Sequence, residues 1–259
     1  MRPLRPQNIP KNTAGPARTG SYAEGNGFPR EVIKGKWRSG KLIDDRVFLE
    51  ILETIKKQST CSFYKTGALI VKDNRIVSIG YNGTPSGFPQ CNELNEFLEW
   101  VLKNRDDREK VESLLDCVLE NNCSDDFLAE KFVLFEKYPL TEYRPLRERI
   151  KETALKMLEE LEEGKEVDLY RYNFIHSRYE IHAEQNAIAY SVKAGTNING
   201  STIYSALLPC MECAKLIVAS GIKRVVYTED YTDKRFNESS VDFLRMNGVD
   251  VVKLNLEKL

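Results

Sequence analysis

Residues 182–229, HAEQNAIAYSVKAGTNINGSTIYSALLPCMECAKLIVASGIKRVVYTE, alternate between helical and extended patterns, and this alternation decides the fold. The first part predicts a helix that stops at Gly195, because glycine commonly follows the last residue of a helix. TIYSALL then predicts a strand, CMECAKLIVASG a helix that ends at Gly221, and KRVVYTE a second strand. The alternation continues with a predicted helix in SSVDFLRMNG and a last strand in VDVVKL.

The segment before residue 92 predicts the beginning of the same layered fold. In IDDRVFLEILETIKK, apolar residues recur at helical spacing, and Asp44 and Asp45 are placed to cap the helix start. GALIVK and RIVSIGYN predict two strands that Asp73-Asn74 joins as a hairpin. GYNGTPSG predicts a loop because of its glycines and proline. The resulting order, α-β-β-α-β-α-β-α-β, predicts an α/β layered sandwich.

Two segments lie outside this sandwich, which we predict from residues 41–91 and 171–259. Residues 1–40 are rich in Gly, Pro, Asn, Arg and Lys, which predicts an extended arm or a disordered tail, or an oligomer contact. Residues 92–170 predict a helical insertion about the size of a small domain. It contains four amphipathic patterns with Glu- and Lys-rich outer faces, at 92–104, 107–121, 124–137 and 144–164.

The composition is that of a globular protein with a core, since 41% of the residues are hydrophobic and 30% are charged. The formal net charge of −1 provides no overall positive field for a nucleic-acid backbone, although a local basic patch remains compatible with it. No apolar run is long enough to span a bilayer, and the N-terminal MRPLRPQNIP lacks the apolar region of a secretory signal. We therefore expect a soluble, cytoplasmic protein (in the host cytoplasm if it is viral) with no membrane partner.

Two short strings carry the candidate chemistry: HAE at residues 182–184 and PCMEC at residues 209–213. The chain has only 2 histidines and 6 cysteines, so their positions are informative. His182, Cys210 and Cys213 would offer zinc one imidazole and two thiolates and leave the fourth tetrahedral position open for water. Each string opens a predicted helix, whose positive N-terminus favours the thiolate form of cysteine.

Glu184 lies two residues from His182, close enough to such a metal to reach its water without being a ligand. Zinc lowers the pKa of bound water to about 7. Glu184 would take the water proton and deliver it to N3 of a cytosine ring, hydroxide would attack C4, and Glu184 would protonate the departing ammonia. The cysteine pair alone would also fit a redox pair or half a zinc ribbon. Together, H-x-E and P-C-x-x-C are the known signature of zinc-dependent deaminases.

The chain resembles the deoxycytidylate deaminases of the cytidine deaminase superfamily in three stretches: STCSFYKTGALIVKDNRIVSIGYNGTPSG, IHAEQNAI and LLPCMECAKLIVASGIKRVVY. The similarity covers about residues 43–91 and 172–255 and skips the N-terminal arm and the insertion. GYNG-x-P-x-G is the discriminating element within the superfamily. The resemblance implies a three-layer α/β/α sandwich with a five-stranded mixed sheet. It also implies conversion of dCMP to dUMP for thymidylate synthesis.

The same resemblance implies roles for individual residues beyond the three zinc ligands and the catalytic Glu184. It places Asn82 at the sugar hydroxyl of the substrate, with Ala183 as a second substrate-binding residue. Gly80, Tyr81, Asn82 and Gly83 would belong to an allosteric loop, where dCTP activates and dTTP inhibits many members. Members of the family are commonly hexamers, so a homo-oligomer is expected.

Some relatives of viral and competence-associated type carry a second, structural zinc. Its ligands fall where Cys61, Cys91 and His176 stand in this sequence, and Cys117 or Cys123 would supply the fourth from the insertion. The alternative is that the two cysteines are small buried hydrophobic residues and the histidine a satisfied polar residue.

Other functions remain open from the sequence. One is deamination of another cytidine nucleotide, such as dCTP or a modified dCMP. Another is editing of nucleic acid, which would need a basic channel lined with aromatic residues. A third is non-catalytic nucleotide binding, which has no need for Glu184. No residue is assigned to the substrate phosphate: Lys65 and Arg178 adjoin the motifs, but ordinary surface charge explains both.

Overall fold

A single mixed sheet of five strands forms the centre of the fold, in the order β2-β1-β3-β4-β5. The computed structural model describes residues 43–120, 140–232 and 239–254, so the predicted arm at 1–40 lies outside the described residues. β1 pairs antiparallel with β2 and β3, whereas β3, β4 and β5 run parallel. The strands are β1 (Gly67–Lys72), β2 (Arg75–Tyr81), β3 (Thr202–Leu207), β4 (Arg224–Glu229) and β5 (Asp250–Lys253).

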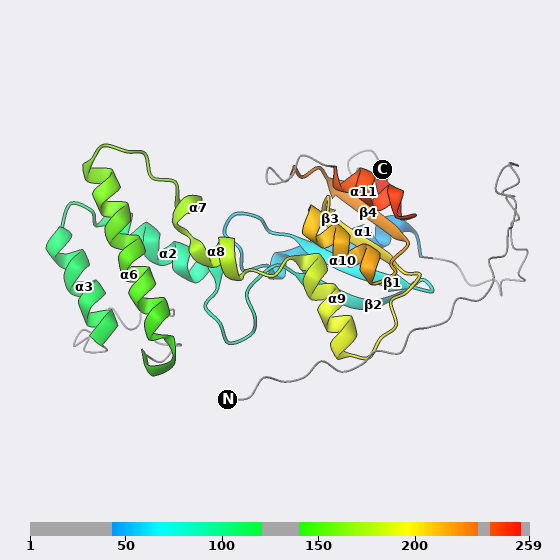
Figure 1. Cartoon of the computed structure of the whole chain (residues 1–259), viewed down its shortest axis with the longest axis horizontal. Helices are drawn as coiled ribbons and strands as arrows, with labels where there is room; N and C mark the ends of the chain where they lie inside the picture. The colour runs from blue at the N-terminus through cyan, green and yellow to red at the C-terminus, as the bar shows by residue number, and fades with distance from the viewer. Residues whose placement is uncertain (1–42, 121–139, 233–238, 255–259) are drawn as a thin grey trace, which may run out of the picture. The chain divides into compact units, whose positions relative to one another are not determined.

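Helices cover both faces of the sheet, which confirms the predicted three-layer sandwich (Figure 1). These helices are α1 (Asp45–Ile55), α9 (Ala183–Lys193), α10 (Met211–Ala219) and α11 (Ser240–Met246). In β1, Ala68 and Ile70 face α9 and α10, and Leu69 and Val71 face α1. Successive side chains of a strand point to opposite faces, so a strand buried on both sides is apolar along its buried length, as residues 67–71 (GALIV) of β1 are.

The start of α1 is held by two aspartates with different tasks. Asp44 is the N-cap residue, and its side chain accepts a hydrogen bond from the Arg46 N–H, as predicted. Asp45 instead forms a two-pronged ion pair with Arg224 of β4, with N–O distances of 2.9 and 2.7 Å, and accepts a hydrogen bond from the Tyr204 hydroxyl. This contact fastens α1 to the middle of the sheet.

The hairpin between β1 and β2 confirms the prediction at the turn and, to within one residue, at the end of β2. Asp73 and Asn74 both have positive φ, 49° and 60°, as the favoured two-residue hairpin turn requires. The predicted strand RIVSIGYN covers residues 75–82, and β2 runs through Tyr81, where Gly80 pairs with Ala68 and Tyr81 with Gly67. The first two residues of the overlapping predicted loop, GYNGTPSG, therefore belong to the strand. Gly80 lets α9 pack directly on this strand, since a Cβ at this position would lie 2.2 Å from the Ala183 carbonyl oxygen.

The insertion is helical, as predicted, and has a hydrophobic core of its own. Its described helices are α2 (Cys91–Lys103), α3 (Arg108–Glu120) and α6 (Leu140–Glu162), and α7 (Leu169–Tyr172) and α8 (Phe174–Tyr179) lead back to the sheet (Figure 1). α6 begins at Leu140 rather than at the predicted Arg144, and the predicted helix at 124–137 lies outside the described residues.

Cys61, Cys91 and Ile175 complete the core of the insertion, so it is continuous with the segments on either side of the inserted helices. Leu42–Leu259 form one compact unit, and the division of this unit at residues 92 and 170 stays a prediction. No helix within the described ranges is both long enough and apolar enough to span a membrane.

Candidate active site

Three side chains from two helix starts meet at one end of the sheet. His182 is the N-cap residue of α9, Cys210 is the N-cap residue of α10, and Cys213 lies in the first turn of α10. The His182 Nδ1 atom lies 3.4 Å from the sulfur of Cys210 and 3.4 Å from that of Cys213. The candidate ligand atoms of all three residues lie within 4.8 Å of one another. The structure thus brings together the three residues that the two sequence motifs predicted.

This donor set fits a zinc ion. Zn–S distances of about 2.3 Å and Zn–N distances of about 2.1 Å imply that the sulfur and nitrogen ligands of a tetrahedral site lie roughly 3.6 Å apart. The observed 3.4 Å separations are close to this value. Hydrogen bonds from the Cys213 thiol and from His182 lower the pKa of Cys210 to about 4, although burial opposes them. A thiolate is therefore stable here, which is the form that binds metal.

Glu184 lies beside this cluster and is almost completely buried, with 4% of its surface exposed. One carboxylate oxygen, Oε1, accepts a hydrogen bond of 2.7 Å from the Ser205 hydroxyl, and the other, Oε2, lies 3.5 Å from the Cys213 sulfur. Burial raises the pKa of Glu184, and the bond from Ser205 counters part of this rise. A carboxyl group with a raised pKa takes up a proton more readily than an exposed one, which suits a group that must both accept and return a proton.

A pocket of about 430 Å³ opens above these residues. Its wall is lined by Tyr64, Thr66, Asn82, Tyr170, His176, Ser177, Glu180, His182, Glu184, Leu207, Leu208, Cys210, Tyr231 and Thr232. Tyr64 contacts Tyr170 and Tyr231 edge to face, with ring centroids 6.1 and 6.3 Å apart. The volume and the aromatic wall suit a small planar molecule.

Asn82 lies in this wall and also holds the neighbouring loop in place. Its Oδ1 accepts hydrogen bonds from the Ser59 hydroxyl (2.6 Å) and the Thr66 N–H (3.0 Å), and its Nδ2 donates to the Tyr64 carbonyl (2.7 Å). The amide is therefore oriented before any ligand binds. Ala183, the other predicted substrate-binding residue, is fully buried against Gly80 and is not part of the pocket lining.

The two basic candidates for the substrate phosphate lie elsewhere. Lys65 and Arg178 are exposed, and neither lines the pocket. The lining residues within the described part of the chain include neither lysine nor arginine. The phosphate contact thus stays unassigned.

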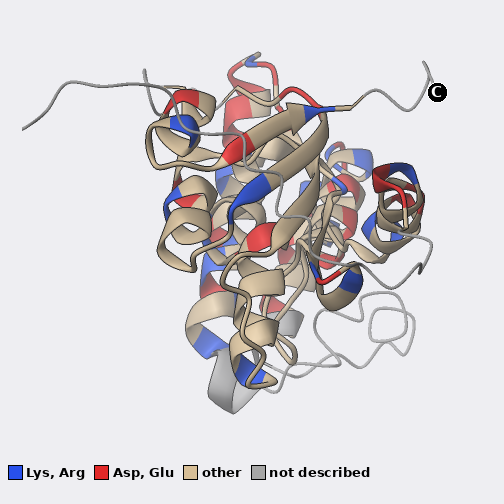
Figure 2. Ribbon diagram, turned by 90° about the vertical axis from the view of Figure 1, so that its right-hand side faces the viewer, with Lys and Arg blue, Asp and Glu red and all other residues tan. Residues whose placement is uncertain are grey.

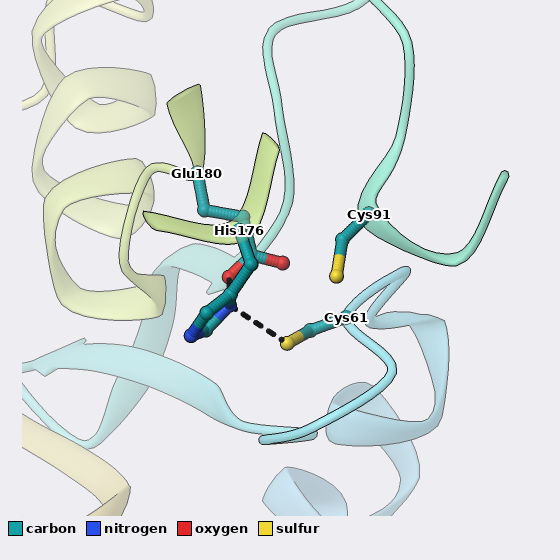
Figure 3. A group of neighbouring side chains, drawn as sticks. All are labelled: Cys61, Cys91, His176 and Glu180. Carbon is teal, nitrogen blue, oxygen red and sulfur yellow. Dashed lines mark hydrogen bonds and ion pairs between the residues drawn. The ribbon is translucent and has the colours of Figure 1, made fainter. Parts of the chain in front are cut away.

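A second cluster of four side chains lies next to the pocket: Cys61, Cys91, His176 and Glu180 (Figure 3). The Cys61 sulfur is 3.4 Å from His176 Nδ1, and the same nitrogen is 2.8 Å from Glu180 Oε2. Backbone N–H groups of Phe63 and Tyr64 donate to the Cys61 sulfur, and that of Ser62 donates to the Cys91 sulfur. Hydrogen bonds from the Cys91 thiol, from His176 and from the Phe63 and Tyr64 N–H groups lower the pKa of Cys61 against the effect of burial.

The fourth member of this cluster corrects the sequence prediction. Glu180 completes the group, whereas Cys117 is not part of it and Cys123 lies outside the described residues. The Glu180 Oε1 atom is buried without a hydrogen-bond partner among the described residues, as expected of an oxygen that a cation would occupy. The sequence signal was the spacing: Glu180 follows His176 by four residues, so both lie on one side of a helical turn.

Sequence reasoning also missed Ser205 and the aromatic residues of the pocket. Ser205 is a polar residue at an inward position of a buried strand, which was visible in TIYSALL and unused. Tyr170 and Tyr231 come from segments far apart in the sequence, so only the tertiary structure places them near Tyr64.

Comparisons with known proteins show which family this chain is similar to. Residues 43–229 match the family model of the cytidine and deoxycytidylate deaminase zinc-binding region. The deoxycytidylate deaminase of Enterobacteria phage T2 is 31% identical over 214 residues, which is 82% of this chain and 94% of the phage protein. The probable deoxycytidylate deaminase of Drosophila melanogaster is 30% identical over 75% of this chain and 64% of its own length. The crystal structure of dCMP deaminase from the cyanophage S-TIM5 in complex with dCMP and dUMP is 23% identical, covering 81% of this chain and 96% of that one, with a TM-score of 0.44.

Proposed function

The chain belongs to the cytidine and deoxycytidylate deaminase family, and from this premise we propose that it converts dCMP to dUMP by zinc-dependent hydrolytic deamination. The observation that carries the proposal is the meeting of His182, Cys210 and Cys213 beside the buried Glu184, in the wall of one pocket. The similarity to phage deoxycytidylate deaminases over nearly their whole length supports the choice of nucleotide.

In this proposal, His182, Cys210 and Cys213 hold the catalytic zinc. When bound by three protein ligands, zinc lowers the pKa of a water molecule and so supplies a nucleophile at neutral pH. Glu184 would take one proton from the attacking water and deliver it to N3 of the cytosine ring as the C4–O bond forms. Glu184 would then move the remaining proton of that oxygen to the amino nitrogen, so that the C4–N bond breaks and ammonia leaves. Cytosine and water thus become uracil and ammonia, and Glu184 returns to its starting state.

The pocket supports a small nucleotide as the substrate. In this proposal Asn82, which lines the pocket with its amide already oriented, binds the sugar, and the tyrosines of the wall offer faces and edges to the pyrimidine. Within the described residues, Lys and Arg are interspersed with Asp and Glu on the side of the ribbon drawn in Figure 2 and do not gather in one basic stripe there. A polynucleotide substrate would call for such a stripe.

The second cluster holds a second zinc in this proposal, with Cys61, Cys91, His176 and Glu180 as its ligands. Four protein ligands close the coordination shell, which makes the site structural rather than catalytic. The N–H groups directed at both sulfurs and the unpartnered Glu180 oxygen support it. Since His176 and Glu180 also line the pocket, this zinc would fasten the start of α2 to the pocket wall.

Oligomerisation and regulation belong to the same proposal. A hexamer is expected from the family, with dCTP as activator and dTTP as inhibitor. Because Gly80 and Tyr81 are part of β2, effector-dependent movement would begin at Asn82 and Gly83. Sedimentation with and without each nucleotide tests the hexamer, and a monomer would contradict it. Turnover measured with dCTP and with dTTP tests the regulation, and turnover that neither nucleotide changes would contradict it.

The function is tested by ammonia release from a panel of dCMP, CMP, dCTP and a cytosine-containing single-stranded DNA, with zinc measured on the same sample. We expect dCMP to be the best substrate. Turnover of the oligonucleotide in place of dCMP would replace the proposal with nucleic-acid editing. Binding of dCMP without ammonia release, by zinc-loaded protein, would show a nucleotide-binding protein instead.

A further inference from the structure

Ser205 is a hydroxyl in a place where the fold calls for an apolar side chain. It lies in β3, which is paired on both sides, with Ala68 of β1 and Tyr227 of β4 as neighbours. Ile203, two residues earlier and therefore on the same face, packs in the core beneath α9 and α10. Ser205 itself is 0% exposed. A buried hydroxyl is costly unless it is hydrogen-bonded, so its partner explains its presence.

That partner is Glu184. The Ser205 hydroxyl donates to Glu184 Oε1 over 2.7 Å, and both residues are shielded from solvent. The two carboxylate oxygens therefore have different surroundings: Oε1 faces the sheet, and Oε2 lies 3.5 Å from the Cys213 sulfur, on the side of the candidate zinc ligands. The torsion that turns a glutamate carboxyl group is broad, so without a fixed partner the plane of the carboxylate could rotate and neither oxygen would be held toward the ligands.

We propose that Ser205 is a positioning residue for the deamination reaction, which holds Glu184 Oε1 so that Oε2 is the oxygen that takes up and releases the proton. This inference rests on the proposed function. A carboxylate oxygen and the carbonyl oxygen of a protonated carboxyl group both accept hydrogen bonds. The bond from Ser205 to Oε1 therefore persists when Oε2 is protonated, and the carboxyl group keeps one orientation throughout the cycle.

The experiment compares Ser205→Ala with Ser205→Thr, which keeps the hydroxyl, in steady-state deamination of dCMP. We expect Ser205→Ala to lower kcat by about 10- to 100-fold, the range for a hydrogen bond to a charged group, and to change KM by less than about 2-fold. Zinc content and Tm should stay near those of the parent protein, because alanine fits the space of serine. Ser205→Thr should recover most of the lost kcat.

A second comparison separates positioning of Glu184 from a purely structural role. If Ser205 acts through Glu184, then Ser205→Ala adds little further loss of kcat to a chain that already carries Glu184→Gln, because coupled residues are not additive. A full additional loss in that double variant would overturn the proposal. A Ser205→Ala variant with the kcat of the parent would also overturn the proposal. The same holds if kcat of this variant falls only in proportion to a loss of bound zinc. If the parent protein itself releases no ammonia from dCMP, it is the proposed function that fails, and this outcome is seen before any variant is compared.

Discussion

Replacing Gly80 with alanine would place a methyl group into the contact between β2 and α9. An ideal Cβ at this position lies 2.2 Å from the Ala183 carbonyl oxygen, 2.4 Å from the Ala187 nitrogen and 3.0 Å from the Ala187 Cα. All three are backbone atoms of α9, so no flexible side chain can move aside. Ordinary contact begins near 3.4 Å, so the helix must move away from the strand by about 1 Å.

Gly80→Ala is expected to lower both stability and activity, because α9 packs on Gly80 and its first turn carries Glu184. Forcing one methyl group into a closely packed site costs about 1–3 kcal/mol. For a chain of this size that lowers Tm by roughly 2–10 °C. The first turn of α9 carries Glu184, and His182 immediately precedes it. A misplacement of about 1 Å between reacting groups can cost about 100-fold in rate. We therefore expect Gly80→Ala to lose about 100-fold in kcat/KM together with the fall in Tm.

Thermal denaturation and ammonia release from dCMP measure both parts of this prediction. Ile79→Thr is the matched control, because Ile79 is the adjacent β2 residue, is 43% exposed and points away from α9. It should change stability by no more than about 0.5 kcal/mol and leave turnover unchanged. A Gly80→Ala protein with the Tm and turnover of the parent would refute the reasoning, since it would mean that β2 and α9 are not in contact at this glycine.

Three further predictions concern the metals, the proton carrier and the fastening of α1. Glu180→Gln should lower the zinc content from two ions per chain to one, as measured by elemental analysis; an unchanged content of two would exclude Glu180 as a ligand. Glu184→Gln should keep the catalytic zinc and lower kcat by about 100- to 10,000-fold, and full turnover would rule out the mechanism given above. The hydrogen bonds from Arg224 hold the pKa of Asp45 below its ordinary value against the opposing effect of burial, so their stabilisation is present above about pH 4 and is lost as the pH falls through the folded-state pKa. The difference in Tm between the parent and Asp45→Asn should therefore be constant between about pH 5 and about pH 8 and should shrink below about pH 4. A difference in Tm that grows as the pH falls would contradict the assigned ion pair.

The sequence by itself determined the features that depend on neighbouring residues. Helix and strand periodicity, the Asp73-Asn74 turn and the glycine stops are local, so the order of the elements and the layered fold could be predicted before any contact was known. The same holds for HAE and PCMEC, because each motif occupies a single helix start and its side-chain types specify a zinc deaminase. The prediction of dCMP as the substrate came from the resemblance to the deoxycytidylate deaminases.

Only the tertiary structure decided the features that depend on residues far apart in the chain. It placed Ser205 against Glu184 across the contact between β3 and α9, and it made Glu180 the fourth member of the second cluster. The physical reason is common to both: backbone preference acts over a few residues, whereas burial, hydrogen-bond partners and close contacts are set by whichever segment the fold brings alongside.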